Sequence, residues 1–307
     1  MKVNILKYFS ISIVILLSII IYLSLVGLET ERFNNQIKSK IIQANKNLDL
    51  ELKKIKLTLD LFNFKVNAKT VGATVLYSKR PLPLEYIKTK VSIGSIFKKK
   101  IVSSNIEIVT KSILVTDLIK FIRATNNKPE LFILEKLVKK GHVIFDLNLN
   151  FDEKGNIKND YKIKGFLKDG KLNLLSKNSF KDINFNFLLI KDNYSLGNIK
   201  LSTNEINFVS ESIVVKKNKN SFLIEGNFKN KKSKLNTDIL KFLNKYFQNI
   251  SNELKIGNTN FSTENKFSVE IDSKLNITNI ILNSDINFDQ INYKNTQLIK
   301  NYFPDTN

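Results

Sequence analysis

A long apolar stretch without a single charged side chain, residues 8–28, constrains this chain more than any other feature. About 20 apolar residues at a helical rise of 1.5 Å cross a hydrocarbon core of roughly 30 Å, so the stretch is long enough to span a bilayer. Lys2 and Lys7 precede it, while Glu29 and Glu31 follow it. Because lysines mark the cytoplasmic side, we expect the N-terminus in the cytoplasm and the rest of the chain outside it.

A cleaved signal peptide is the alternative reading of this stretch. Such a peptide has an apolar region of about 7–15 residues ahead of a small-x-small site. Here the apolar run is longer, and Ser24, Leu25, Val26 and Gly27 match that site poorly. No cysteine follows, which excludes a lipoprotein. We therefore interpret residues 1–29 as a cytoplasmic tip and an uncleaved transmembrane anchor.

With one histidine and no cysteine, the chain has no room for a Ser-His-Asp triad away from His142, a thiol protease site or a zinc site. Without cysteine there are no disulfides, cysteine-ligated metals or thiol nucleophiles. His142 is the only histidine and falls on the polar side of an expected strand. The ten glycines form no phosphate-binding loop, and the nearby Asp146, Asp152 and Glu153 are typical of a solvated turn. We expect no enzymatic activity, no cofactor, and no catalytic or metal-binding residues.

The net charge of +21 resembles that of nucleic-acid-binding proteins. All but three of the 49 basic residues are lysine, however, the exceptions being Arg32, Arg80 and Arg123. Proteins that read nucleic acids rely on arginine for bidentate contacts. The lysines alternate with apolar residues, as on a solvated strand face, and a basic domain near a membrane is also drawn to anionic lipids. We expect no nucleic-acid partner.

The period of the apolar residues changes from helical to strand-like soon after the anchor. Residues 30–46 have helical spacing, and from residue 48 apolar and polar side chains alternate. Phase slips at Lys53-Lys54 and Leu61-Phe62 predict bulges or register changes, and Pro81 and Pro83 are expected to break the ladder. Helices are expected over residues 118–125, capped by Asp117, and 129–140. Residues 30–140 thus form an N-terminal helix and a β region with capping helices.

Residues 141–307 are expected to form a repeating antiparallel β region with one inserted helix near 237–250. Residues 143–151 alternate most clearly. Because helices are too few to connect parallel strands, each strand is expected to lie in an antiparallel sheet with one wet face. The predicted fold class is mainly β: a transmembrane helix, then a long curved antiparallel sheet, a groove or an open sandwich, with a few short helices.

The apolar faces of these strands are the candidate functional surface. Their most prominent members are Leu57, Leu59, Phe145, Leu147, Leu149, Ile163, Phe185, Phe187, Phe222 and Phe228. A row this long does not stay open to water without a role. It either closes against a second sheet as a sandwich core, or forms a trough that holds lipid acyl chains, each buried CH₂ contributing about 0.8 kcal/mol.

The order of features resembles the AsmA-like family, which includes TamB and YhdP. The resemblance lies in the N-terminal span, the short helix, the segments LPLEYI at 82–87 and VSIGSI at 91–96, Ile106-Glu107-Ile108, and YKIKGFLKDG at 161–170 with the strand at 183–189. It covers most of residues 1–230 and consists of apolar spacing with few fixed residues. Family members are usually far longer, so the chain is expected to be a short member or an N-terminal fragment.

The resemblance implies a single-pass protein of the bacterial inner membrane with its bulk in the periplasm. Its partners would be phospholipid or another acyl lipid, the inner membrane and envelope proteins. The function expected on this basis is binding of acyl chains in an apolar β-groove, contributing to lipid transport or outer-membrane biogenesis. The alternative is a membrane-tethered structural or scaffold β-sandwich without lipid cargo.

Overall fold

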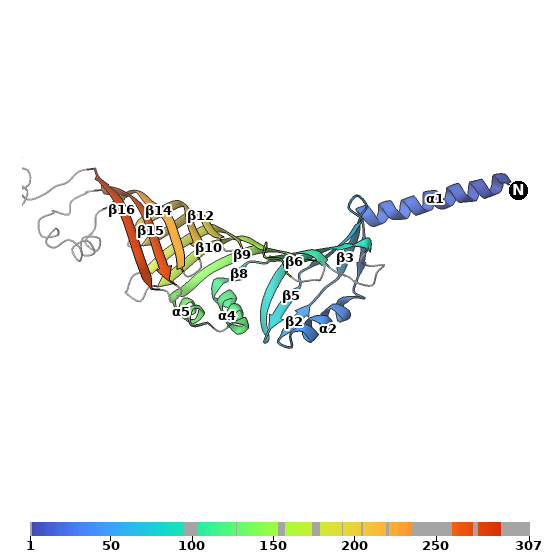
Figure 1. Ribbon diagram of the computed structural model, residues 1–307, viewed down its shortest axis with the longest axis horizontal. Coiled ribbons are helices and arrows are strands. Elements are labelled where there is room, and N and C mark those ends of the chain that lie inside the picture. The colour runs from blue at the N-terminus through green and yellow to red at the C-terminus, as the bar shows by residue number, and fades with distance from the viewer. Residues whose placement is uncertain are drawn as a thin grey trace, which may run out of the picture. The chain divides into compact units, whose positions relative to one another are not determined.

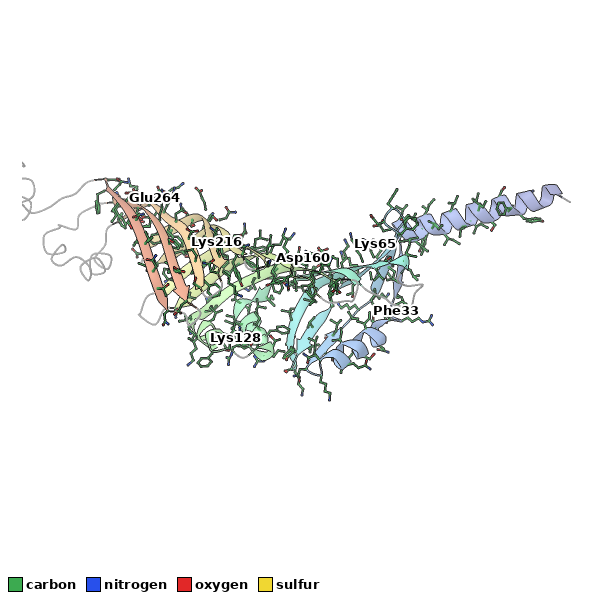
Figure 2. All side chains as sticks on the ribbon, viewed as in Figure 1. Phe33, Lys65, Lys128, Asp160, Lys216 and Glu264 are labelled. Carbon is green, nitrogen blue, oxygen red and sulfur yellow. The ribbon has the colours of Figure 1, made fainter. Side chains whose placement is uncertain are left out.

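The computed structural model describes residues 2–94, 103–126, 128–152, 157–173, 179–191, 193–203, 205–218, 221–234, 260–272 and 276–289. Strands dominate, as predicted. The described helices are α1 (Lys2–Leu25), α2 (Asn34–Ala44), α4 (Val115–Thr125) and α5 (Pro129–Leu137). Phe33 immediately precedes α2, and Lys128 immediately precedes α5 (Figure 2).

The first nine strands, shown in Figure 1, are β1 (Leu28–Thr30), β2 (Leu48–Glu51), β3 (Ile55–Asp60), β4 (Lys65–Val71), β5 (Thr74–Tyr77), β6 (Arg80–Ser92), β7 (Ser103–Thr110), β8 (Ile113–Leu114) and β9 (Val138–Asn150). They are followed by β10 (Lys162–Asn173), β11 (Ser179–Ile190), β12 (Asn193–Thr203), β13 (Ile206–Lys217), β14 (Ser221–Lys234), β15 (Asn260–Asp272) and β16 (Ile277–Phe288).

The described strands pair in the order β1-β3-β4-β6-β7-β9-β10-β11-β12-β13-β14-β15-β16, with β2 on β5, β5 on β6 and β8 on β9. The sheet is antiparallel and open, which confirms the predicted fold class. By its internal contacts the chain forms two compact units. The first unit comprises Met1–Lys136, His142–Phe166 and Leu188–Lys191, and the second Leu137–Gly141, Leu167–Phe187 and Asp192–Asn307.

Helix α1 contains, over Lys7–Leu25, the one described segment that is long and apolar enough to cross a membrane. The helix ends three residues before the apolar run does, because Leu28 instead begins β1. Gly27 makes the bend with a φ of +79°. A β-carbon at Gly27 would lie 2.4 Å from the carbonyl oxygen of Leu57, so only glycine fits between α1 and β3.

The core of the first unit is a small cluster made by Leu50, Ala73 and Leu84, all buried. The chain covers this cluster with α2, whose Ile37 and Ile41 lie one turn apart on one helix face. The predicted slip at Lys53-Lys54 lies where the chain leaves β2, which pairs with β5, and enters β3, which pairs with β4.

Two predictions, one about a strand and one about a helix start, were wrong. Pro81 and Pro83 do not break the ladder, since both lie inside β6. The neighbouring Leu84 N–H donates to Ala73 of the β5 side, whereas Pro83 offers only its carbonyl oxygen to Lys111. At Pro83 the ladder therefore uses only the carbonyl oxygen, so the missing proline N–H breaks no hydrogen bond. Asp117 lies in the first turn of α4 instead of capping it, because the helix already begins at Val115.

The predicted bulge or register change at Leu61-Phe62 is a turn that joins β3 to β4. The helix predicted near 237–250 lies outside the described residues.

Candidate functional site

The strand register of the first unit sorts its side chains onto two chemically different faces. Directly paired residues of neighbouring antiparallel strands point to the same side of a sheet. One row across β3, β4, β6, β7 and β9 is Leu57, Ala68, Thr89, Ile106 and Leu149. The next row on this side is Ile55, Thr70, Ile87, Ile108 and Leu147. We call this side the first apolar face.

The opposite side of the same strands is polar and basic. One of its rows is Lys56, Lys69, Lys88, Glu107 and Asn148. Like charges placed directly opposite one another destabilise a sheet. A cation–π contact offsets part of this repulsion, because the Nζ of Lys69 lies 4.4 Å from the centroid of the Tyr86 ring.

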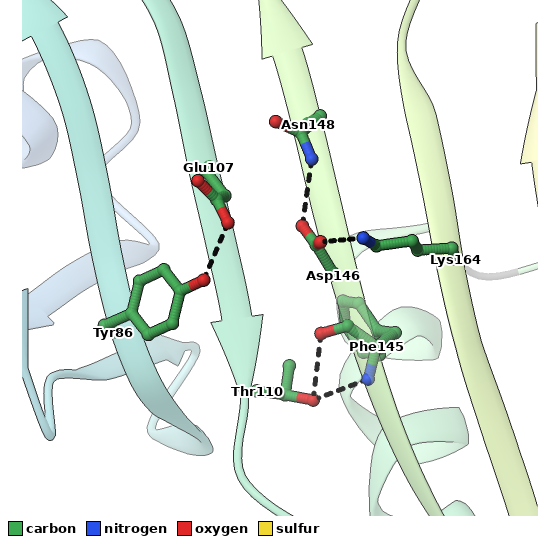
Figure 3. Close-up of polar contacts among 7 residues, drawn as sticks. All are labelled: Tyr86, Glu107, Thr110, Phe145, Asp146, Asn148 and Lys164. Atoms are coloured by element: carbon green, nitrogen blue, oxygen red, sulfur yellow. Dashed lines mark hydrogen bonds and ion pairs between the residues drawn. The ribbon is translucent and has the colours of Figure 1, made fainter.

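Hydrogen bonds and an ion pair tie this polar side together (Figure 3). Asp146 pairs with Lys164 at 3.1 Å and accepts a hydrogen bond from Asn148 at 3.0 Å. Because Lys164 thereby lies on the polar side, its strand neighbour Ile163 lies on the first apolar face. On the other side of the sheet, at the same parity as Ile108, the buried Thr110 is bonded to the backbone of Phe145: its Oγ1 accepts from the N–H at 3.0 Å and donates to the carbonyl oxygen at 3.4 Å.

The alkaline titration of Tyr86 tests this polar network. Its hydroxyl donates to Glu107 at 2.6 Å, and this bond, aided by burial, raises the pKa of Tyr86 from 10.0 to about 12. Between these pH values the folded chain keeps a proton that the unfolded chain has lost, so the free energy of unfolding falls as pH rises through that window. The difference in phenolate absorbance between wild type and Tyr86→Phe should show that Tyr86 is the last tyrosine to lose its proton as pH rises. In Glu107→Gln the pKa of Tyr86 should return toward 10. An ordinary pKa in the wild type would contradict the bond.

The first apolar face is covered over part of its length. Ile87 and Ile108 pack against the cluster of Leu50, Ala73 and Leu84, and α4 buries Ile119 on the same unit. The row that ends at Leu147 therefore adjoins the core cluster, and Leu57, Leu147 and Leu149 are all half-buried.

In the second unit, β12, β13, β14, β15 and β16 also have two different sides. One row across them is Tyr194, Val215, Ile224, Val269 and Ile280, and the next is Leu196, Ile213, Gly226, Phe267 and Leu282. We call this side the second apolar face. The corresponding row on its other side is Asn193, Lys216, Leu223, Glu270 and Asn279.

Aromatic rings line the second apolar face. The rings of Phe208 and Phe228 meet edge to face at 6.5 Å between centroids, and Phe228 stacks on Phe267 at 5.8 Å. Gly226 makes room for this cluster, because a β-carbon there would lie 3.1 Å from the Phe267 ring. The face is therefore apolar over these two rows, whereas the next row pairs Phe228 with the polar residues Asn265 and Ser284.

No second layer of described residues covers the second apolar face. The described part of the second unit contains strands only, and they all belong to the open sheet. Phe222, Ile224 and Phe228 are accordingly half-buried, and Ile280 and Leu282 at the edge remain 60% and 63% exposed. Apolar surface of this extent is typical of a binding face.

A small cavity lies elsewhere in the second unit, where Asn198 has a φ of +53° and the register of β13 and β14 shifts between Val209 and Ile213. Its volume is about 190 Å³, and Lys200, Glu211 and Lys229 help to line it. Sites for small molecules usually measure about 300–1,000 Å³, so the open face is the larger candidate surface.

All ten residues predicted for the groove lie on strands, and all are half-buried. Register places Leu57, Leu59, Leu147 and Leu149 on the first apolar face, and Phe222 and Phe228 on the second. The residues missed by the prediction are those that complete the rows: Tyr194, Val215, Ile224, Phe267, Val269 and Ile280. Alternation alone would have found Ile224, which lies between Phe222 and Phe228 at the same parity.

Within the described ranges no three His, Asp or Glu side chains gather as a metal site, and His142 lies exposed on β9. Scans of protein-family models, of curated proteins and of solved structures give no match to this chain. Its function is therefore inferred from the geometry of its own residues.

Proposed function

We propose that this protein binds lipid acyl chains on its apolar sheet faces and is anchored by α1 in the bacterial inner membrane, with its bulk in the periplasm. The N-terminal lysines and the apolar span support this orientation. In this role it contributes to lipid transport or outer-membrane biogenesis, as the resemblance to AsmA-like proteins implies.

The observation that carries the proposal is the second apolar face, over which the described residues place no second layer. Five neighbouring strands each contribute an apolar residue to one row, and the rings of Phe208, Phe228 and Phe267 extend it. An acyl chain laid along such a face gains about 0.8 kcal/mol for each CH₂ removed from water. Binding needs no specific polar contact, so the acyl chain slides along this surface with little resistance.

The basic side chains support the same role. Lys56, Lys69 and Lys88 stand in one row on the polar side of the first unit, directly opposite one another. Anionic phospholipid head groups relieve such like-charge crowding and attract a basic surface within a Debye length of the membrane.

Photocrosslinking tests the proposal. A p-benzoyl-phenylalanine at Phe228 of the full chain, irradiated in cells before purification in detergent, should give phospholipid adducts by mass spectrometry. The matched position is the next residue, Lys229, which lies on the opposite side of β14. We expect adducts at position 228 in at least about tenfold excess over position 229, since acyl chains favour apolar surface by several kcal/mol.

The scaffold alternative makes the opposite prediction for this experiment. A protein adduct at position 228 without lipid would show that a partner, and no acyl chain, covers the second apolar face. Equal lipid adducts at both positions would mean that the sheet has no lipid-binding face.

A further inference from the structure

The turn between β3 and β4 exposes apolar side chains to an unusual degree. Phe62 is 99% exposed, Phe64 is 73% exposed and Leu61 is 39% exposed. Hairpin turns are ordinarily made of glycine, asparagine, aspartate, serine and proline, because their tips face water. Two phenylalanines at a tip therefore indicate a surface other than water around this turn.

The turn is held in a defined shape. The Asp60 carboxylate accepts hydrogen bonds from the Asn63 N–H at 3.1 Å and from its Nδ2 at 3.0 Å, and these bonds hold the pKa of Asp60 below its ordinary value. Phe64 adopts a φ of +50°, which is uncommon for a bulky residue. Its carbonyl oxygen accepts from the Ile93 N–H at 3.0 Å. The phenylalanines are thus presented by a fixed turn.

The turn lies beside the membrane end of α1. Strand β1 pairs with β3 so that Thr30 faces Ile55 and Leu28 faces Leu57. Further toward the N-terminus, within α1, the Ser24 Oγ donates to the carbonyl oxygen of Leu59 at 2.8 Å. The contacts therefore move along β3 toward the turn as they move back along α1 toward its N-terminus.

The depth of the turn follows from these contacts. Ser24 is the next to last residue of the apolar span, which places Leu59 at the level where the helix leaves the hydrocarbon. From Leu59 to Phe62 the chain reaches at most about 10 Å. Apolar side chains of interfacial helices sit about 5–10 Å inside the head-group boundary, so the reach matches. Tyr22 of α1, 54% exposed, marks the same level, where aromatic side chains gather.

We propose that Leu61, Phe62 and Phe64 insert into the interfacial layer of the membrane that α1 spans, as a second attachment beside the helix. Lys65 follows the turn directly and pairs with Asp60 at the end of β3 (Figure 2). With Gly27 allowing close contact between helix and strand, the two attachments fix β3 at the bilayer surface. This attachment goes beyond lipid carriage and holds whether or not the sheet carries lipid.

The test uses the full chain in phospholipid nanodiscs with p-benzoyl-phenylalanine at Phe62. The matched position is Phe132 of α5, which is 45% exposed in the same unit. We expect lipid adducts at position 62 in about tenfold excess over position 132, because only the turn reaches the acyl region. Equal adducts, or none at position 62, would overturn the proposal.

A second measurement separates insertion from mere proximity. Since the chain has no cysteine, Lys65→Cys carries a single fluorophore beside the turn. Lipids with a spin label near the head group should quench it, and the Phe62→Ser, Phe64→Ser double variant should reduce this quenching about threefold or more. Unchanged quenching in the double variant would show that the phenylalanines do not hold the turn in the membrane.

Discussion

Full-length Ile224→Asp should retain at most about one tenth of the phospholipid that copurifies with the wild-type chain. Ile224 lies in the middle strand of a five-strand apolar row, between Val215 and Val269. An ionised carboxylate there would face hydrocarbon without a partner, at a cost of several kcal/mol, whereas about 1.4 kcal/mol already corresponds to a tenfold loss of binding. Quantitative lipid mass spectrometry of the purified protein measures this loss.

Leu223→Asp is the matched control for that variant. It makes the same change on the adjacent residue, which points to the other side of β14 between Lys216 and Glu270. We expect wild-type lipid content in this variant. Both variants should unfold cooperatively near the wild-type temperature, because neither side is closed by a second layer of described residues. Equal lipid loss in both, or unfolding of Ile224→Asp alone, would indicate a closed core in place of a lipid-binding face.

Gly27→Val should open the junction between α1 and the sheet. Its β-carbon would meet the Leu57 carbonyl oxygen at 2.4 Å, and a β-branched residue at a φ of +79° is strained as well. We expect a local cost of about 3 kcal/mol, which corresponds to a roughly hundredfold faster hydrogen exchange of the β3 amides that pair with β1. Exchange mass spectrometry of the full chain in nanodiscs measures this rate.

Gly94→Val provides the control, since a β-carbon at Gly94 would meet nothing closer than the Ser92 hydroxyl at 3.7 Å. The exchange of β3 should then remain at its wild-type rate. Equal acceleration in both variants, or none in Gly27→Val, would mean that α1 is joined to the sheet by a loose linker.

Much of the strand pattern was predictable because alternation is a local property. The run from Val143 to residue 151 predicted β9, and alternation around Leu57 predicted β3. Pro81 and Pro83 misled the prediction, because whether a proline breaks a ladder depends on which side of the strand needs a donor. That side is set by the neighbours, here Ala73 and Lys111.

The turn at residues 61–64 was predicted as a bulge or a register change for a related reason. Leu61 and Phe62 are apolar and continue the strand pattern, so the phase slip between them indicates a bulge or a register change within a strand. The structure turns the chain there, with Asn63 bonded to Asp60. The only local signal for this turn was the Asp60 and Asn63 pair, which favours turns but occurs widely in so asparagine-rich a chain.

The sequence by itself determined the apolar span, the change to a period of two, and the assignment of alternate residues such as Phe222 and Phe228 to one side of a strand. These properties depend on neighbours along the chain. Only the tertiary structure decided which rows are covered: Ile108 packs on the cluster of Leu50 and Leu84, while Ile224, also half-buried, has no second layer of described residues over it. Coverage depends on strand register and on layers from distant segments, because a side chain is buried by what packs over it and not by its own pattern.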